Sequence, residues 1–437
     1  MHSFKVKTIN LFTAAFLTMF FVLGFISFAP ILVAFALYCL ANRRVHFGDI
    51  RRAGIPALGA IFLVAVLSTI TLSPYPFSAW NTGKDLYFFF APILMLILGL
   101  TFINSPSDFE RILTTAVKIF TIISIMLFSD FLFSGGVFNI SLEARYSYGL
   151  DSTASTLALL LIISLRPTLA ALAARSTLSA LAILNLALII ASLSRVNISI
   201  TFISLVFVYS HNRLIQSAVF VGTMFVIAAP LLQLSYIAPT GSTSGDFSFL
   251  GKLQNSLQEF RISNYSDLGD INENWRGYEA YLGIEQVQQV GGWANLIGVG
   301  FGSFARGPFV DKLTLIPYFH NGFVTIFLKS GTLGIAFFTI FSGKLYMVSR
   351  LAFLQARSNS DQRVTCAALI IFLFTNSMLM RTLTTHGVYY AKTTLELFFI
   401  GLSIYVIGRL QRDRARVLRF CEDESHLEPQ TAAKAER

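Results

Sequence analysis

Apolar runs of about 20 residues recur along the whole chain, with short polar segments between them. Runs of this length with few charges are typical of helices that cross a membrane. The pattern therefore predicts an all-α polytopic membrane protein with about twelve transmembrane helices. The expected spans are residues 8–24, 28–42, 54–73, 85–103, 112–134, 149–165, 176–192, 195–210, 214–235, 321–343, 363–382 and 391–409.

Two polar segments divide the chain into regions. Spans one to nine fill residues 1–235, and spans ten to twelve fill residues 321–410. Between them lies a long loop, residues 236–320, in which apolar residues recur at helical spacing from Asn274 to Val290. We expect a short helix there, on the outer face. The charged segment 411–437 has no apolar period and is expected to be a disordered cytoplasmic tail.

The distribution of Lys and Arg orients the spans. Clusters such as Arg43-Arg44, Arg51-Arg52 and the arginines of 409–419 all fall on one side if the N-terminus is cytoplasmic. The long loop then faces the periplasm. The formal net charge of +10 is thereby explained by membrane topology, and we expect membrane lipids and no nucleic acid as partners.

Composition excludes several classes. The chain of 437 residues is 54% hydrophobic and only 13% charged, which is not the composition of a soluble protein. Its three cysteines indicate no disulfide framework. The sequence contains neither a GxxxxGK[ST] loop nor an HExxH motif. Any chemistry is therefore expected to need no metal and no cofactor.

Four arginines fall on the expected outer side, although Lys and Arg prefer the cytoplasmic side. They are Arg145, Arg195, Arg276 and Arg381. Each could snorkel or pair locally, and Arg276 could pair with Glu279 one turn later. Alternatively, they form an anion site, since guanidinium donors match phosphate oxygens. A charge near hydrocarbon is costly, which favours the second interpretation for Arg195.

A glycine-rich turn, Gly298–Phe304, precedes His320 and Asn321 at the start of an apolar span. Asn321 is a good N-cap, which places His320 beside the positive end of a helix dipole. A neutral histidine there is a candidate general base, although it could instead only satisfy loop backbone. Lys329, about 12 Å into the span, would contact phosphate or pair with a carboxylate such as Glu396.

The order of these motifs resembles the O-antigen ligase and O-antigen polymerase superfamily of bacterial envelopes. The resemblance covers residues 145–345 and lies in Arg145–Thr153, Ser194-Arg195, Arg276, Gly298–Gly302, His320-Asn321 and Gly331–Gly334. After Ser-Arg the family often has a small residue, whereas this chain has Val196. At the position of Lys329 an acidic or neutral residue is more usual.

The resemblance implies a metal-independent glycosyltransferase in the bacterial inner membrane. The donor would be a glycan on undecaprenyl pyrophosphate. The acceptor would be a lipid-linked repeat unit in an O-antigen or exopolysaccharide polymerase, which we favour, or lipid A-core in a ligase. His320, Arg276 and Arg195 are the expected catalytic residues. Arg145, Asn321, Arg381 and Lys329 are expected to bind substrate.

Another class remains open, namely a transporter of an anionic lipid or solute. Transporters commonly bind near the midplane and contain inverted repeats. This sequence shows no internal repeat, and its unusual charges gather at one face, which favours surface chemistry. A non-catalytic scaffold would leave the outer arginines and His320 without a reason.

Overall fold

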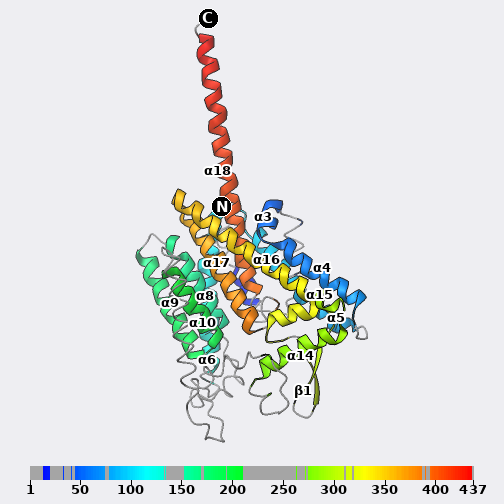
Figure 1. Ribbon diagram of the computed structural model, residues 1–437. Helices are drawn as coiled ribbons and strands as arrows, with labels where there is room; N and C mark the ends of the chain where they lie inside the picture. The colour runs from blue at the N-terminus through cyan, green and yellow to red at the C-terminus, as the bar shows by residue number, and fades with distance from the viewer. Residues whose placement is uncertain are drawn as a thin grey trace.

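The structure is a computed structural model in which helices account for nearly all regular elements (Figure 1). It describes residues 13–19, 45–73, 78–131, 152–168, 172–192, 194–209, 274–309, 312–316, 319–385 and 394–435, and six isolated residues: Val33, Ala41, Phe133, Ile262, Ile271 and Tyr389. The helices discussed below are α3 (Phe47–Arg52), α4 (Ile55–Thr71), α5 (Ala79–Thr101), α6 (Phe109–Phe131), α8 (Thr153–Leu165), α9 (Leu172–Ser192), α10 (Arg195–Tyr209), α14 (Trp275–Val290), α15 (Ala294–Ile297), α16 (Gly322–Asn359), α17 (Gln362–Thr384) and α18 (Thr394–Ala435).

The described residues contain five helices that are long and apolar enough to cross a membrane. These are Ala79–Thr101, Pro106–Asp130, Gly322–Ser358, Gln362–Thr384 and Thr394–Arg419. Shorter apolar helices occupy the expected positions of four further spans. The prediction of a helical, membrane-like protein is thereby confirmed. The expected spans 8–24, 28–42 and 214–235 lie mostly or wholly outside the described residues, so their number stays a prediction.

Close packing of α5 on α18 forms the centre of the bundle. A Cβ on Gly99 would collide with the backbone of Phe398 and Leu402, and one on Gly401 would collide with Leu96. The two helices therefore touch backbone to backbone. Beside this contact the rings of Phe102 and Phe398 meet edge to face, with their centroids 4.9 Å apart.

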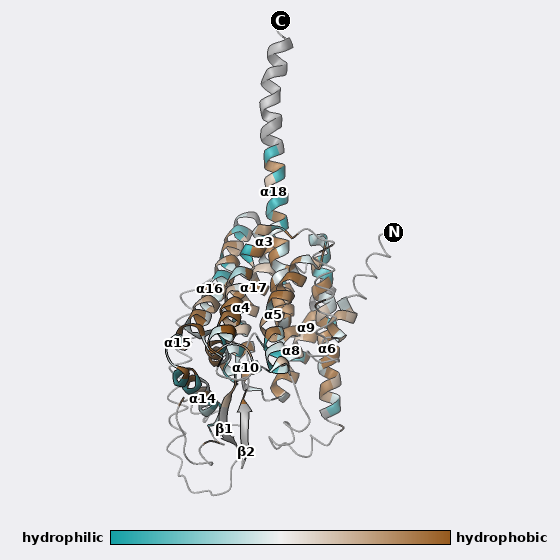
Figure 2. Ribbon diagram, turned by 90° about the vertical axis from the view of Figure 1, so that its right-hand side faces the viewer, coloured by the Kyte–Doolittle hydropathy of each residue, from teal (hydrophilic) through white to brown (hydrophobic). Residues whose placement is uncertain are grey.

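A second, smaller hydrophobic core lies at the end of the bundle away from the C-terminus (Figure 2). It joins α14 to the start of α16, and its buried members include Tyr278, Val287, Phe319 and Val324. The helix expected over 274–290 is therefore confirmed as α14. A hairpin of β1 (Ala305–Phe309) and β2 (Lys312–Ile316) accompanies it and was not predicted, since a two-stranded ribbon this short leaves little periodicity to detect.

The segment 411–437, expected to be disordered, differs in the structure because α18 continues to Ala435. Arg412 binds Asp49 of α3 at 2.8 Å, and Arg414 binds Asp361 at 3.1 Å. These ion pairs fix the first turns beyond the bundle. The remaining residues are rich in Arg, Glu, Gln and Ala, which favour helix without any apolar face.

The α5–α18 contact generates a stability prediction. Gly99→Ala forces the two backbones apart and should lower the free energy of unfolding by ~1–3 kcal/mol or more. Gly83→Ala, in the same helix, is the matched control, because nothing lies within 4 Å of its added Cβ. It should be neutral or stabilise by ~0.5–1 kcal/mol. Thermal unfolding in detergent measures both, and equal midpoints would contradict the packing described.

Candidate functional site

The first feature of the site is a histidine–carboxylate pair between α14 and the start of α16. Nδ1 of His320 lies 3.0 Å from Oε2 of Glu279, and the backbone N–H of His320 donates to the same oxygen at 3.1 Å. The Glu279 side chain is only 3% exposed, whereas that of His320 is 29% exposed. The carboxylate is thus built into the fold, and the imidazole reaches the surface.

This pair fixes the tautomer and orientation of the ring. An ionised carboxylate only accepts hydrogen bonds, so Nδ1 carries the proton and Nε2 keeps its lone pair in the neutral ring. Trp275 meets the His320 ring at a steep angle, with the ring centroids 4.4 Å apart. The histidine is therefore held on two sides, and its Nε2 is the atom that can accept a proton.

Asn321 forms the expected N-cap of α16. Its side-chain oxygen accepts from the backbone N–H groups of Phe323 and Val324 at 3.0 and 3.3 Å. The predicted position of His320, directly before a helix N-terminus, is confirmed. The amide of Asn321 is used by the backbone in this structure, which gives it a structural role before any contact with substrate.

The glycine-rich turn packs against the bundle through its backbone. Ser68 of α4 donates to the carbonyl of Gly298 at 2.6 Å, and Phe301 N–H donates to Thr69 at 2.6 Å. A Cβ on Gly300 would collide with the backbone of Thr69, and its φ is +88°. Glycine is required here for close approach as well as for conformation. The turn is therefore bound to α4 by hydrogen bonds and close backbone packing.

The same turn fits into a break in α16. Gly331 leaves the helical conformation, with φ 63° and ψ −161°. A Cβ at Gly331 would collide with Leu296 and with the backbone of Gly298. The carbonyl of Leu328, one turn before the break, accepts from Val299 at 2.7 Å. Gly298 and Gly331 are therefore explained by this backbone contact.

Lys329 is fully buried beside this contact. Its ammonium lies 2.6 Å from Oδ2 of Asp85 in α5 and also donates to the carbonyl of Ser303. The N–H of Gly302 donates to the same carboxylate oxygen at 2.8 Å. Of the two roles expected for Lys329, the structure supports a carboxylate pair, but with Asp85 rather than Glu396.

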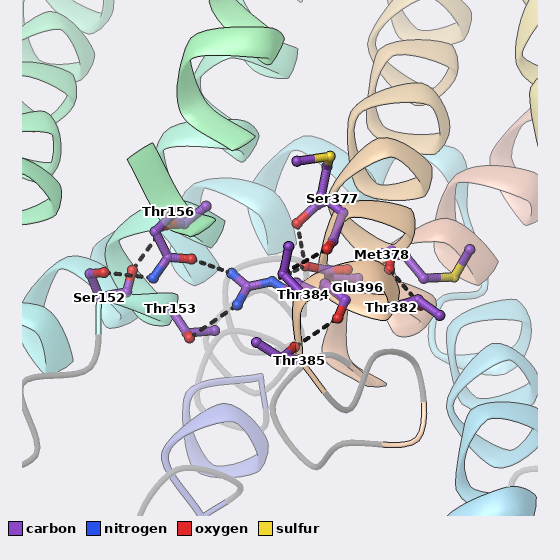
Figure 3. A network of polar contacts seen from close by, with 12 residues as sticks. Ser152, Thr153, Thr156, Ser377, Met378, Thr382, Thr384, Thr385 and Glu396 are labelled. Carbon is purple, nitrogen blue, oxygen red and sulfur yellow. Dashed lines mark hydrogen bonds and ion pairs between the residues drawn. The ribbon is translucent and has the colours of Figure 1, made fainter. Parts of the chain in front are cut away.

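Glu396 instead pairs with Arg381 inside the bundle (Figure 3). Arg381 Nε lies 3.2 Å from Oε1 of Glu396, and Ser377 donates to the same oxygen at 2.6 Å. The other end of the guanidinium donates to Asn197 of α10 at 2.7 Å, and Asn197 donates to Ser152 at 2.6 Å. This network ties α8, α10, α17 and α18 together, so Arg381 pairs locally.

The three remaining arginines differ in how much of each the structure describes. Arg195 begins α10 two residues before Asn197, but its side chain lies outside the described residues. Arg145 lies outside them altogether. Arg276 lies on α14 one turn before Glu279, whose carboxylate is occupied by His320. Arg276 therefore lies beside the histidine pair, whereas the places of Arg145 and Arg195 in a site stay predictions.

Two carboxylates of this region were not identified as functional from the sequence. From the sequence Glu279 is only a possible partner for Arg276, and nothing assigns a role to Asp85. The spacing of apolar residues placed Glu279 on the loop helix. Nothing in the sequence pairs Glu279 with His320, 41 positions away, or Asp85 with Lys329, 244 positions away. Within the described residues no group of three His, Cys, Asp or Glu side chains could hold a metal ion. A metal-free reaction stays a prediction.

The Lys329–Asp85 pair generates a second stability prediction. Lys329→Met leaves a buried carboxylate without its cation and should cost ~3–5 kcal/mol. Adding Asp85→Asn removes that charge and keeps an acceptor for Gly302 N–H, so the double variant should recover part of the loss. Thermal unfolding in detergent measures the series. A stable Lys329→Met protein would contradict a structural role.

The resemblance to a known family rests on the sequence motifs alone. A scan against protein-family models and a search of the curated proteins each found no match. The resemblance to the O-antigen ligase and polymerase superfamily therefore stays a prediction. It rests on the ordered set Ser194-Arg195, Arg276 and His320-Asn321 in the sequence.

Proposed function

We propose that the protein is a membrane glycosyltransferase. It would move a glycan from undecaprenyl pyrophosphate to an acceptor sugar, as a repeat-unit polymerase of O-antigen or exopolysaccharide. The alternative acceptor is lipid A-core, which would make it an O-antigen ligase. The observation that carries the proposal is the His320–Glu279 pair, in which a partly exposed imidazole is oriented by a buried carboxylate.

The proposal includes a location and a topology. The protein would cross the bacterial inner membrane about twelve times, with both termini in the cytoplasm and residues 236–320 in the periplasm. In support, α14 and the hairpin lie at one end of the bundle, and α3 and the arginine-rich part of α18 lie at the other (Figures 1 and 2). Basic residues favour the cytoplasmic side.

In the proposed reaction, the acceptor hydroxyl attacks C1 of the donor sugar. The new C1–O bond forms as the bond from C1 to the pyrophosphate oxygen breaks, and the electron pair leaves with the lipid diphosphate. The hydroxyl proton passes to Nε2 of His320. Glu279 stabilises the resulting imidazolium through Nδ1–H, at 3.0 Å in the resting structure.

The leaving diphosphate gains charge, so it needs donors near the base. Arg276 is the candidate best supported by position, since it precedes Glu279 by one helical turn on α14. Arg195 and Arg145 remain candidates from the motifs. Arg381 and Lys329 are bound to Glu396 and Asp85, so the proposal now gives them positioning roles in the bundle.

The proposal predicts graded losses of activity. His320→Ala should reduce the transfer rate on the order of 10²–10⁴-fold, because the base is gone. Glu279→Gln should reduce it less, on the order of 10-fold or more, since the ring keeps a hydrogen-bond partner but its cation is less stabilised. Purified protein with a lipid-linked repeat unit of the host glycan measures the rates.

His46 supplies the matched control. It caps α3 at the opposite end of the bundle, where Nδ1 accepts from Gly48 N–H. His46→Asn keeps a capping group and should retain full activity. Polymer formed from repeat units alone indicates a polymerase, and transfer only to added lipid A-core indicates a ligase. If His320→Ala keeps most of the wild-type rate, the proposed mechanism is wrong.

The topology can be tested separately. In a variant with Cys39, Cys366 and Cys421 replaced, Ser244→Cys in the long loop should react with an impermeant thiol reagent in intact spheroplasts. Ser360→Cys, between α16 and α17, is exposed and should react only after permeabilisation. The opposite pattern would reverse the orientation and place His320 in the cytoplasm.

A further inference from the structure

A pocket of about 360 Å³ lies where α3, α16 and α18 meet. It is at the end of the bundle from which α18 projects, opposite α14 (Figure 1). Its polar lining includes Arg51, Arg52 and Lys344, and its apolar lining includes Met347, Leu351 and Ile407. None of these residues belongs to the site around His320.

The charges at the pocket are mostly positive. The carboxylate here, Asp49, is buried and held by Arg412 at 2.8 Å, with Arg52 at 3.5 Å. Arg51 and Lys344 have no ion-pair partner within the part of the chain that the structure describes. Two cations therefore remain to bind an anion, while the acidic group behind them is already neutralised.

The apolar wall leads from this basic end along the side of the bundle. Met347 and Leu351, one turn apart on α16, are 55% and 58% exposed. Leu354 continues the same surface at 57% exposed, and Phe47 of α3 is 75% exposed. These α16 side chains belong to a helix that is long and apolar enough to cross a membrane, where they would contact lipid. The pocket therefore adjoins both a basic boundary and a strip of hydrocarbon-facing side chains.

We propose that this pocket binds the phosphate headgroup of an anionic phospholipid. Arg51 and Lys344 would contact the phosphate, and the acyl chains would lie along Met347, Leu351 and Leu354. Basic pockets between transmembrane helices at the cytoplasmic side are suited to such headgroups. The site is independent of the proposed transferase activity.

Its dimensions and surroundings favour a lipid over a soluble anion. The volume exceeds what a free phosphate needs and lies in the range of ligand pockets. A soluble phosphate would leave Met347 and Leu351 uncovered, whereas a lipid uses the charges and the apolar strip together. The guanidinium of Arg51 and the ammonium of Lys344, which line the same pocket, also provide donors for the phosphate oxygens.

Binding can be measured by native mass spectrometry with dioctanoyl phosphatidylglycerol, and with dioctanoyl phosphatidylcholine as the neutral reference. The test variant is Arg51→Gln with Lys344→Gln. The matched control is Arg350→Gln with Arg357→Gln, which removes two exposed cations from the same half of α16 without touching the pocket. The test variant should bind the anionic lipid about 30-fold more weakly, at ~1 kcal/mol for each charge. The control should bind normally.

Three results would overturn the proposal. Equal losses in both double variants would reduce the effect to general surface electrostatics. Equal binding of the two lipids by the wild type would remove the headgroup from recognition. Displacement of the bound lipid by millimolar inorganic phosphate, with unchanged affinity in a Leu351→Gln variant, would make the pocket a site for soluble phosphate. Thermal unfolding in phosphatidylcholine bicelles verifies that each variant is folded.

Discussion

The arrangement of the bundle end that carries α14 depends on one contact between two stretches of backbone. Gly298 and Gly331 approach so closely that a Cβ on either would overlap the other segment. This approach is possible only because α16 breaks at Gly331, which gives the Gly298–Gly302 turn a place to pack. The turn in turn holds α15 and the end of α14, and α14 carries Glu279. The orientation of His320 thus depends on a helix break three turns away along α16.

Burial of charge follows a consistent rule in this bundle. Lys329 and Arg381 are each nearly or fully buried, and each meets one carboxylate from another helix. In both pairs the carboxylate accepts a further hydrogen bond, from Gly302 N–H of the glycine-rich turn in one and from Ser377, on the same helix as Arg381, in the other. Removal of one partner from such a pair is expensive, whereas the intact pair contributes modest stability. The pairs therefore specify which helices meet more than they strengthen the bundle.

The sequence predicted what depends on local pattern. Apolar length predicted the helices α5, α6, α16 and α17, spacing predicted α14, and a single polar residue before an apolar run predicted the Asn321 cap. The sequence did not predict contacts between residues that are far apart in the chain. The partner of Lys329 is 244 residues away, and Arg381 has partners on α8, α10 and α18. It also failed for α18 beyond residue 410, because helix propensity without an apolar face resembles disorder.

These differences change how the unusual cations should be weighed. An ionisable residue in an apolar span is a functional hypothesis by default, which applies to Lys329 and Arg381, whereas Arg276 is a candidate because it is an arginine of the long loop. In the structure, Lys329 and Arg381 hold helices together, whereas Arg276 lies on the same helix as the carboxylate that orients His320. The distinction comes from the host element. A transmembrane helix must neutralise its charges inside the protein, since lipid offers no partner. α14 is not among the apolar helices of the described residues, so this requirement does not account for Arg276.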